Sequence, residues 1–290
     1  MCGGEVSDSP MFKTNIRRIA SLAGSKLQVA TACSGSDLWM LVMLLWCSRY
    51  LPGVAVDHLW SCDSEELKYE FIRKVWHQPT VFTNVAHLCR SYGEAWGVGM
   101  VPVLPSLIFA AGFSCKAISS LNQASRFFDQ CCETGAGSTG ETYCGILNHV
   151  RVHLPLLVVM ENVRGISRQA QKIIAHFRDI GYVMVFVSMV AIHRGFPQTR
   201  RRGWFMGVLA PAASEAQQLN AQRHATQLEA QLRIHPLPLG DFISDTHSQR
   251  IRKWALQQIS ARDRRRDDEL PYKKWKKATP RVPTSPDHTI

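Results

Sequence analysis

The sequence lacks the patterns that mark secreted, membrane-spanning and zinc-binding proteins. Its nine cysteines form no Cys-x-x-Cys pair, which argues against a zinc ribbon or a thioredoxin-type site, so no metal site is expected. The apolar run at 38–46 is too short to cross a bilayer, and the run at 101–113 is broken by Pro102, Pro105 and Gly112. The first residues carry no secretory signal pattern. These absences predict a soluble intracellular protein of a reducing compartment, with no membrane partner.

Positive charge dominates the chain, and much of it lies near the C-terminus. The net charge is +11, and residues 249–290 hold twelve Lys or Arg against five Asp or Glu. Such an excess favours a polyanionic partner, DNA or RNA. The alternative for this region is a solvated basic tail. The best candidate for a phosphate-binding arm is a cluster of lysines around one tryptophan: Lys273, Lys274, Lys276 and Lys277.

Short apolar runs alternate with longer segments of helical periodicity. The runs are almost continuously apolar, as in strands that are buried on both faces of a parallel sheet. The predicted strands are 27–32, 54–62, 81–85, 106–113, 155–161, 182–190 and 204–209. The predicted helices are 37–49, 64–76, 139–153 and 163–180. This alternation predicts an α/β fold with a doubly wound, mostly parallel sheet and helices on both faces.

The pattern changes near residue 210, and the chain is expected to have three regions. Residues 1–26 form an N-terminal extension, and residues 27–210 form the α/β domain. Residues 211–290 form a short helical and basic extension, which is rich in Gln and Ala at 212–234 and then basic with several prolines.

Chemically useful residues follow four of the predicted strands. A turn of small residues at 31–37 opens the first helix, Asp63 follows the second strand, Cys115 the fourth and Glu161 the fifth. Ligands of doubly wound sheets bind at the carboxyl ends of the strands, where such residues meet. Lys116 would favour the thiolate form of its neighbour Cys115. Taken singly, each feature also has a structural explanation: a tight turn, a helix cap or inert packing of a buried cysteine.

Two arginines precede the last predicted strand. Alternate residues of an extended segment face the same way, so Arg200 and Arg202 share one face. Two fixed guanidinium groups suit a base carbonyl and a phosphate. The alternative is a solvated basic turn.

Three sequence blocks occur in a specific order, each at a strand end. They are Gly112-Phe113-Ser114-Cys115, Glu161-Asn162-Val163 and Gln198-x-Arg200-x-Arg202. Together they resemble the central blocks of the cytosine-C5 DNA methyltransferase family. The turn Cys33-Ser34-Gly35 resembles the cofactor loop of that family, and residues 61–72 resemble its acidic second block. The resemblance covers 27–209 and implies a Rossmann-like methyltransferase sheet, with 27–210 as the S-adenosylmethionine-dependent catalytic domain.

The resemblance implies methyl transfer from S-adenosylmethionine to C5 of cytosine in DNA through a covalent cysteine adduct. Cys115 would attack C6 of the base, Glu161 would stabilise or protonate N3, and Arg202 with Arg200 would hold the base carbonyl. A cytosine inside a duplex would be flipped out, and a nuclear location is expected. The implied cofactor-binding residues are Ala32, Cys33, Ser34, Gly35, Ser36, Asp63, Ser64, Asn84 and Val85. The implied nucleic-acid contacts are Lys116, Gln198, Arg200 and the four C-terminal lysines.

The chain departs from the family pattern in several places. Ser114 and Lys116 flank the cysteine where proline and glutamine are usual, Ser36-Asp37 replaces the second glycine of the cofactor loop, and Asn84 replaces an aspartate. Asp37 is expected to repel the methionine carboxylate. The C-terminal blocks are not recognisable, and the sequence contains no Gly-Asn closing motif. Two alternatives therefore stay open: a tRNA cytosine-C5 methyltransferase, and a catalytically impaired nucleic-acid-binding homologue of the same fold. A nicotinamide-dependent oxidoreductase would share the sheet but would explain none of the three blocks.

Overall fold

A computed structural model describes most of the first 236 residues. The described residues are 17, 19–78, 80–119, 130–196 and 198–236. The chain divides into two compact units, Met1–Leu237 and Pro238–Ile290, and every described residue belongs to the first. The predicted three-region organisation remains a prediction, since 1–16 and 237–290 lie outside the described residues.

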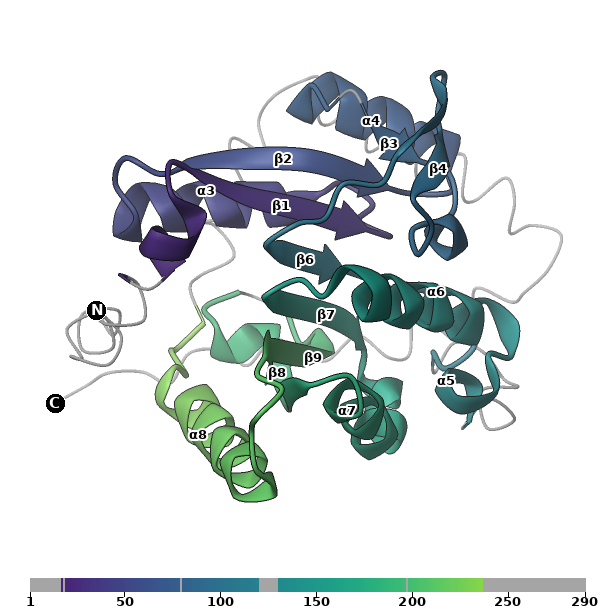
Figure 1. The fold of residues 1–290 in the computed structure, drawn as a ribbon. Helices are drawn as coiled ribbons and strands as arrows, with labels where there is room; N and C mark the ends of the chain where they lie inside the picture. Colours follow the sequence, from purple (N-terminus) through teal and green to yellow (C-terminus); the bar gives the residue numbers. More distant parts are fainter. Residues whose placement is uncertain (1–16, 18, 79, 120–129, 197, 237–290) are drawn as a thin grey trace, which may run out of the picture. The chain divides into compact units, whose positions relative to one another are not determined.

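The centre of the fold is a nine-stranded mixed sheet with the order β5-β4-β3-β2-β1-β6-β7-β9-β8 (Figure 1). The strands are β1 (Lys26–Ala32), β2 (Ala55–Cys62), β3 (Val81–Phe82), β4 (Tyr92–Ala95), β5 (Gly99–Pro102), β6 (Ile108–Ala111), β7 (Leu157–Val163), β8 (Tyr182–Val190) and β9 (Arg201–Leu209). The central strands β3, β2, β1, β6 and β7 pair in parallel. Strand β9 is antiparallel to both β7 and β8. The prediction of a doubly wound, mostly parallel α/β sheet is confirmed.

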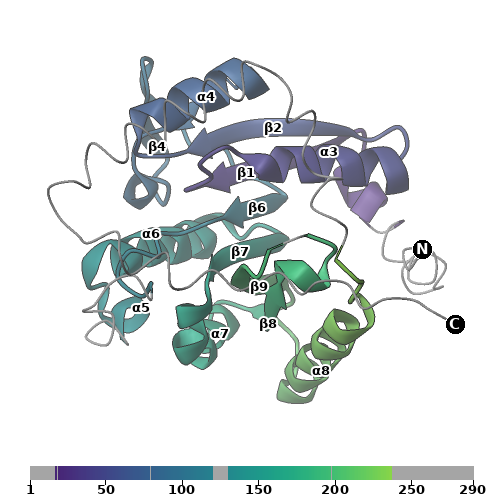
Figure 2. The ribbon, with the colours of Figure 1, turned by 180° about the vertical axis from the view of Figure 1, so that it is seen from behind.

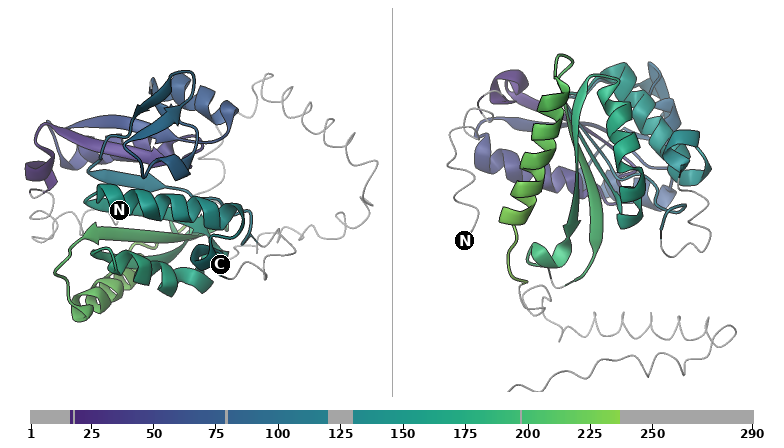
Figure 3. Two further views of the ribbon diagram at one scale, coloured as in Figure 1. Left: turned by 45° about the vertical axis from the view of Figure 1, so that its right-hand side comes forward. Right: turned by 90° about the horizontal axis from the view of Figure 1, so that it is seen from below.

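Helices cover both faces of the sheet. They are α3 (Leu38–Tyr50), α4 (Glu66–Trp76), α5 (Cys131–Thr134), α6 (Gly137–His153), α7 (Ala170–Arg178) and α8 (Glu215–Gln231). Successive side chains of a strand point to opposite faces. In β1, Leu27 and Val29 accordingly pack in a cluster with Met40 of α3, whereas Ala30 joins a second cluster that contains Tyr143 of α6. Figure 2 gives the reverse view, and Figure 3 shows α8 on one side of the sheet with α6 and α7 on the other.

Several elements differ from the sequence prediction. The hairpin of β4 and β5 was not predicted, because its strands have only four residues each; Gly97 in its turn and Gly99 at the start of β5 have positive φ. Strand β3 has only two residues, where 81–85 was expected. The helix expected at 163–180 starts as a 3₁₀ helix, Arg164–Gln169, and becomes α-helical only at Ala170. Such terminal 3₁₀ turns leave little trace in apolar periodicity.

The outer edge of β8 is covered by side chains of α8. Gln218 accepts from Met184 N–H (3.0 Å) and donates to the carbonyl of the same residue. Gln222 accepts from Phe186 N–H (2.9 Å) and donates to its carbonyl (2.8 Å). Residues four apart on a helix are spaced like residues two apart on a strand, so the two amides act as a substitute neighbour for the edge strand.

The parallel strands bring their carboxyl ends to one edge of the sheet. Ala32 of β1 pairs with Ala111 of β6, which pairs with Met160 of β7. The residues that follow these strands therefore meet at this edge, although they lie far apart in the sequence. Among the described residues, no helix is long and apolar enough to span a membrane.

Candidate active site

A cavity of about 670 Å³ opens at the carboxyl edge of the central strands. It is formed by the segments that follow β1, β2, β3 and β6, by the last residues of β2 and β7, by the start of α6 and by the entrance to β9. Its lining consists of residues 62–65, 83–86, 112–116 and 161–163, with Cys33, Lys68, Ser138, Glu141, Thr142, Arg200 and Arg202. Candidate residues from all three sequence blocks thus line one cavity.

Glu161 and Arg202 form an ion pair inside this cavity. The Arg202 Nε atom lies 2.6 Å from Glu161 Oε1, and about a quarter of each side chain is exposed. The pairing of β7 with β9 produces this contact, because it sets Glu161 opposite Trp204 and Val163 opposite Arg202. A charge-assisted hydrogen bond of this kind fixes both side chains while one face of the pair stays open to a ligand. Arg200, just before β9, lines the same cavity.

The Cys115 loop is held from two directions. Asn162 donates through Nδ2 to the carbonyl of Phe113 (3.0 Å) and more weakly to that of Ser114 (3.4 Å). From α6, the Thr142 hydroxyl accepts the N–H of Ser114 (3.2 Å). Ser114 occupies the position where the family pattern has proline, which has no N–H to donate, so this tie to α6 is available only because of the substitution.

Three cysteines line the cavity, and two of them are held as thiols. Burial, reinforced by the negative charge of Asp63, raises the pKa of Cys33 to about 12. Burial likewise raises the pKa of Cys62 well above its ordinary value. A thiol of this kind is a poor nucleophile near neutral pH. Cys115 is partly exposed and is the best nucleophile candidate of the three.

Asp63 lies between the loop that follows β1 and the cavity. It is 5% exposed, and its carboxylate accepts the N–H of Gly35 (3.0 Å) and of Glu65 (3.1 Å). The Lys68 Nζ atom lies 3.8 Å from Asp63 Oδ1 and 3.1 Å from Glu65 Oε1. The carboxylate thus joins the loop after β1 to the start of α4.

The remaining residues predicted to bind the cofactor lie in three kinds of position. Ser64, Asn84 and Val85 line the cavity, like Cys33 and Asp63. Ala32 is fully buried in the sheet. Ser34, Gly35 and Ser36 form the loop between β1 and α3 and are not among the lining residues.

The predicted nucleic-acid contacts are only partly described. Lys116 and Arg200 line the cavity, whereas Gln198 is exposed outside it. The four C-terminal lysines lie outside the described residues. No group of His, Cys, Asp or Glu suited to a metal ion occurs within the part of the chain that the structure describes.

Sequence reasoning missed several cavity residues. Ser138, Glu141 and Thr142 come from the first turns of α6, and Glu65 and Lys68 come from the start of α4. None of them directly follows a strand, so the strand-end rule could not select them. The role of Asn162 was also missed, although a buried amide at the end of an apolar strand requires partners.

Comparisons with known proteins relate this chain to a family. A family model described as "C-5 cytosine-specific DNA methylase" matches residues 104–280, more than half of the chain. The DNA (cytosine-5-)-methyltransferase DMT5 of Cryptococcus neoformans var. grubii is 28% identical over 252 residues, which are 85% of this chain and 10% of that protein. The chain therefore spans about a tenth of the length of this curated relative.

Two solved methyltransferase structures show weaker likeness. The Dnmt2 methyltransferase of S. pombe gives a TM-score of 0.43 at 14% identity, covering 66% of this chain and 51% of that one. The Entamoeba histolytica methyltransferase EhMeth gives a TM-score of 0.45 at 12% identity, covering 66% of this chain and 55% of that one. With TM-scores below 0.5, neither likeness adds support to an assignment. The assignment rests on the family model, which matches more than half of the sequence: the chain belongs to the C-5 cytosine-specific DNA methylase family.

Proposed function

We propose that this chain transfers a methyl group from S-adenosylmethionine to C5 of cytosine in DNA, through a transient bond between Cys115 Sγ and C6 of the base. One observation carries the proposal. Cys115, Glu161, Arg200 and Arg202 come from three separate segments, and all line one cavity together with Asp63 and other residues expected at a cofactor site.

The chemistry requires activation of the base before methylation, because C5 of cytosine is a weak nucleophile. The Cys115 thiolate adds to C6 while Glu161 donates a hydrogen bond or a proton to N3, so that electron density moves to C5. S-adenosylmethionine, when bound, supplies the electrophilic methyl group for C5. Loss of the C5 proton to solvent then lets the electron pair of that bond expel the Cys115 sulfur, and a proton given to N3 returns to Glu161, which restores the neutral ring.

Arg202 and Arg200 serve to orient the base. Arg202 is already held through Nε by Glu161 at 2.6 Å and through Nη1 by the carbonyl of Arg201 at 2.9 Å, so it can bind a ligand without a large further loss of side-chain entropy. A guanidinium beside the base carbonyl stabilises the negative charge that develops when the thiolate adds.

The residues of the cavity fit the cofactor. Its volume lies within the range of about 300–1,000 Å³ that is usual for ligands of this size. Asp63 and Glu65 offer carboxylate oxygens to ribose hydroxyls. Asn84 uses its Oδ1 to accept Ala86 N–H at 2.9 Å, which leaves its amide N–H groups for a ligand acceptor.

Adduct trapping tests the proposal. The chain is incubated with S-adenosylmethionine and DNA that contains 5-fluorocytosine, whose C5 fluorine cannot be lost as a proton, so an active enzyme stays bound to the base. We expect a denaturation-resistant complex with the natural chain and none with Cys115→Ser. Cys89→Ser is the matched control, since Cys89 is another partly exposed thiol that does not line the cavity; this variant should be trapped like the natural chain.

Two outcomes would contradict the proposal. One is a complex that persists in Cys115→Ser, and the other is cofactor binding without adduct or methyl transfer on any DNA. The second outcome, with salt-sensitive DNA binding, would favour an impaired nucleic-acid-binding homologue. Parallel reactions with tRNA as acceptor distinguish a tRNA methyltransferase. A nuclear location remains a prediction that imaging of the tagged chain would check.

A further inference from the structure

The loop between β1 and α3, residues 33–37, has an unusual backbone. Cys33, Gly35 and Asp37 all have positive φ values of 51°, 59° and 54°. A residue other than glycine in this left-handed region costs roughly 1 kcal/mol. Two such residues within five positions persist only where the surroundings hold them in place.

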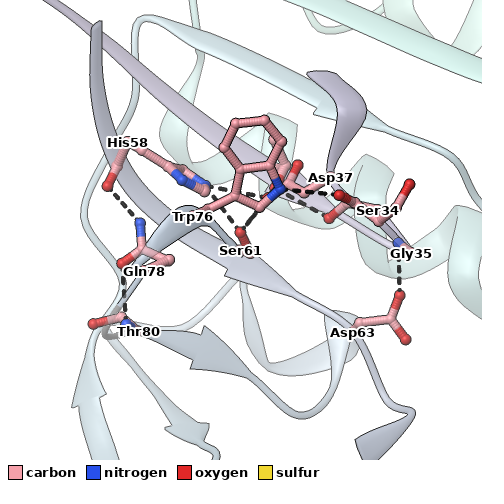
Figure 4. Close-up of polar contacts among 11 residues, drawn as sticks. Ser34, Gly35, Asp37, His58, Ser61, Asp63, Trp76, Gln78 and Thr80 are labelled. Carbon is pink, nitrogen blue, oxygen red and sulfur yellow. Dashed lines mark hydrogen bonds and ion pairs between the residues drawn. The ribbon is translucent and has the colours of Figure 1, made fainter. Parts of the chain in front are cut away.

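The Asp37 side chain provides one anchor, buried beneath the loop (Figure 4). Its carboxylate is fully buried, and Oδ2 accepts hydrogen bonds from Ser61 Oγ (2.5 Å) and Thr31 Oγ1 (3.0 Å). His58 Nε2 lies 3.4 Å from the same oxygen and 2.9 Å from Ser61 Oγ. Because Thr31 belongs to β1 and the other two belong to β2, this carboxylate ties the loop to both strands.

This arrangement overturns the expectation that Asp37 repels the methionine carboxylate. Asp37 does not line the cavity, and its charge is directed into the polar cluster between the strands. Its second oxygen, Oδ1, is buried with no hydrogen-bond partner among the described residues. Burial of a carboxylate with one oxygen unpaired is costly. Glycine would meet the positive φ without that cost, so the backbone conformation alone does not explain why a carboxylate stands here.

The opposite side of the loop is tied to the cavity. Gly35 N–H donates to Asp63 Oδ2 at 3.0 Å, and Asp63 lines the cavity. The Trp76 indole donates to the carbonyl of Ser36 at 2.9 Å, from the end of α4. The loop is therefore held between the Asp37 cluster and Asp63, and a shift of the loop would move the Asp63 carboxylate and Cys33 relative to a ligand.

We propose that Asp37 is a positioning residue for the cofactor: its buried carboxylate anchors loop 33–37 to β1 and β2 and thereby sets Asp63 and Cys33 for S-adenosylmethionine. Asp37 touches neither the cofactor nor the base and acts through the loop. The inference rests on the proposed function, because it concerns the cofactor side of the same cavity.

Two substitutions at this position separate the carboxylate from the backbone conformation. Asp37→Gly keeps the positive φ accessible and removes the anchor, and we expect the Kd for S-adenosylmethionine and for S-adenosylhomocysteine to rise about tenfold in calorimetry. Asp37→Asn keeps an oxygen that accepts from Ser61 and Thr31 and tolerates this backbone region. It should restore most of the affinity, to within about threefold of the natural chain.

A matched control accounts for general destabilisation. Glu229 on α8 is another buried carboxylate, 8% exposed and paired with Arg194 and Arg233, and it is not a cavity residue. Glu229→Gln should lower the melting temperature without changing the Kd of the cofactor. In steady-state assays, Asp37→Gly should raise KM for S-adenosylmethionine and leave kcat at saturation within about twofold, because Cys115 and Glu161 are held by other elements.

The results separate this inference from the proposed function. Cofactor affinity of Asp37→Gly within twofold of the natural chain would overturn the positioning role, as would an equal loss in Glu229→Gln. If the natural chain binds cofactor but transfers no methyl group, the methyl-transfer proposal fails and the affinities still decide the role of Asp37. If the natural chain binds neither S-adenosylmethionine nor S-adenosylhomocysteine, both the methyl-transfer proposal and the positioning role of Asp37 are wrong.

Discussion

Replacement of Glu161 by glutamine separates a chemical role from a structural one. The substitution keeps the size of the side chain and one oxygen near Arg202. It replaces a carboxyl group, which carries a negative charge when ionised and an acidic proton when protonated, by a neutral amide that has neither. In the natural chain Glu161 Oε1 lies 2.6 Å from Arg202 Nε, and both side chains are about a quarter exposed. A neutral amide oxygen still accepts from the guanidinium, so the local geometry should survive.

The expected effects on stability and on rate differ greatly in size. A partly exposed ion pair contributes at most about 1 kcal/mol, so Glu161→Gln should lower the melting temperature by only about 2–4 °C. Loss of a general acid lowers a rate by roughly a hundredfold to ten-thousandfold. Unfolding of a small fraction of molecules cannot account for a loss of that size at 25 °C.

Single-turnover methyl transfer measures the relevant step. Natural and Glu161→Gln chains are mixed with a short cytosine-containing duplex at saturating S-adenosylmethionine, and incorporation of labelled methyl is followed over time. Cofactor affinity should stay within about twofold, because the substitution leaves Asp63 and loop 33–37 untouched. A rate within threefold of the natural chain would refute the assignment of Glu161 as the residue that activates N3.

Two further predictions concern stability. Burial lowers the pKa of His149 to about 4, and its ring is hydrogen-bonded to the carbonyl of Leu88 at 2.9 Å. His149 takes up a proton near pH 6.5 in the unfolded chain and only near pH 4 in the folded chain. Its contribution to the free energy of unfolding is therefore fully present above pH 6.5 and falls by about 3 kcal/mol as the pH drops to 4. Urea unfolding at pH 7, 5.5 and 4.5 should show a steeper loss of stability with falling pH in the natural chain than in His149→Gln, and an equal loss in both chains would contradict this prediction. Gln222→Ala removes two hydrogen bonds to the backbone of Phe186 and should lower the free energy of unfolding in urea by about 1–2 kcal/mol. The control Gln227→Ala, at an exposed position of the same helix, should change it little. Equal losses of stability in the two variants would show that helix propensity, and not the contact with the edge strand, is responsible.

Local sequence signals predicted most of the central sheet and the main site candidates. Continuous apolar runs correspond to strands that are buried on both faces, and each of the predicted helices has a counterpart in the structure. Cys115 and Glu161 could be selected because one lies just past the end of such a strand and the other near its end, and parallel strands bring their carboxyl ends to one edge. Arg200 and Arg202 could be selected together, since a period of two is a local property of extended chain, and both line the cavity.

The contacts that complete the site depend on pairings between distant segments. Insertion of β9 between β7 and β8 in the antiparallel direction sets Arg202 beside Glu161, and no local pattern specifies that order of strands. The tie from Asn162 to the Cys115 loop has the same origin, because it links residues 49 positions apart.

Asp37 shows most clearly where the sequence stops being informative. Its position in a loop of small residues beside a predicted ligand site suggested a charge that faces the cofactor. The direction of its side chain is decided by Thr31 and Ser61, whose hydroxyls meet only when β1 and β2 pair. The sequence by itself determined which segments form strands and which residues follow them, because periodicity and apolar content are local. Only the tertiary structure decided which side chains share a partner, because a hydrogen bond across two strands depends on their register.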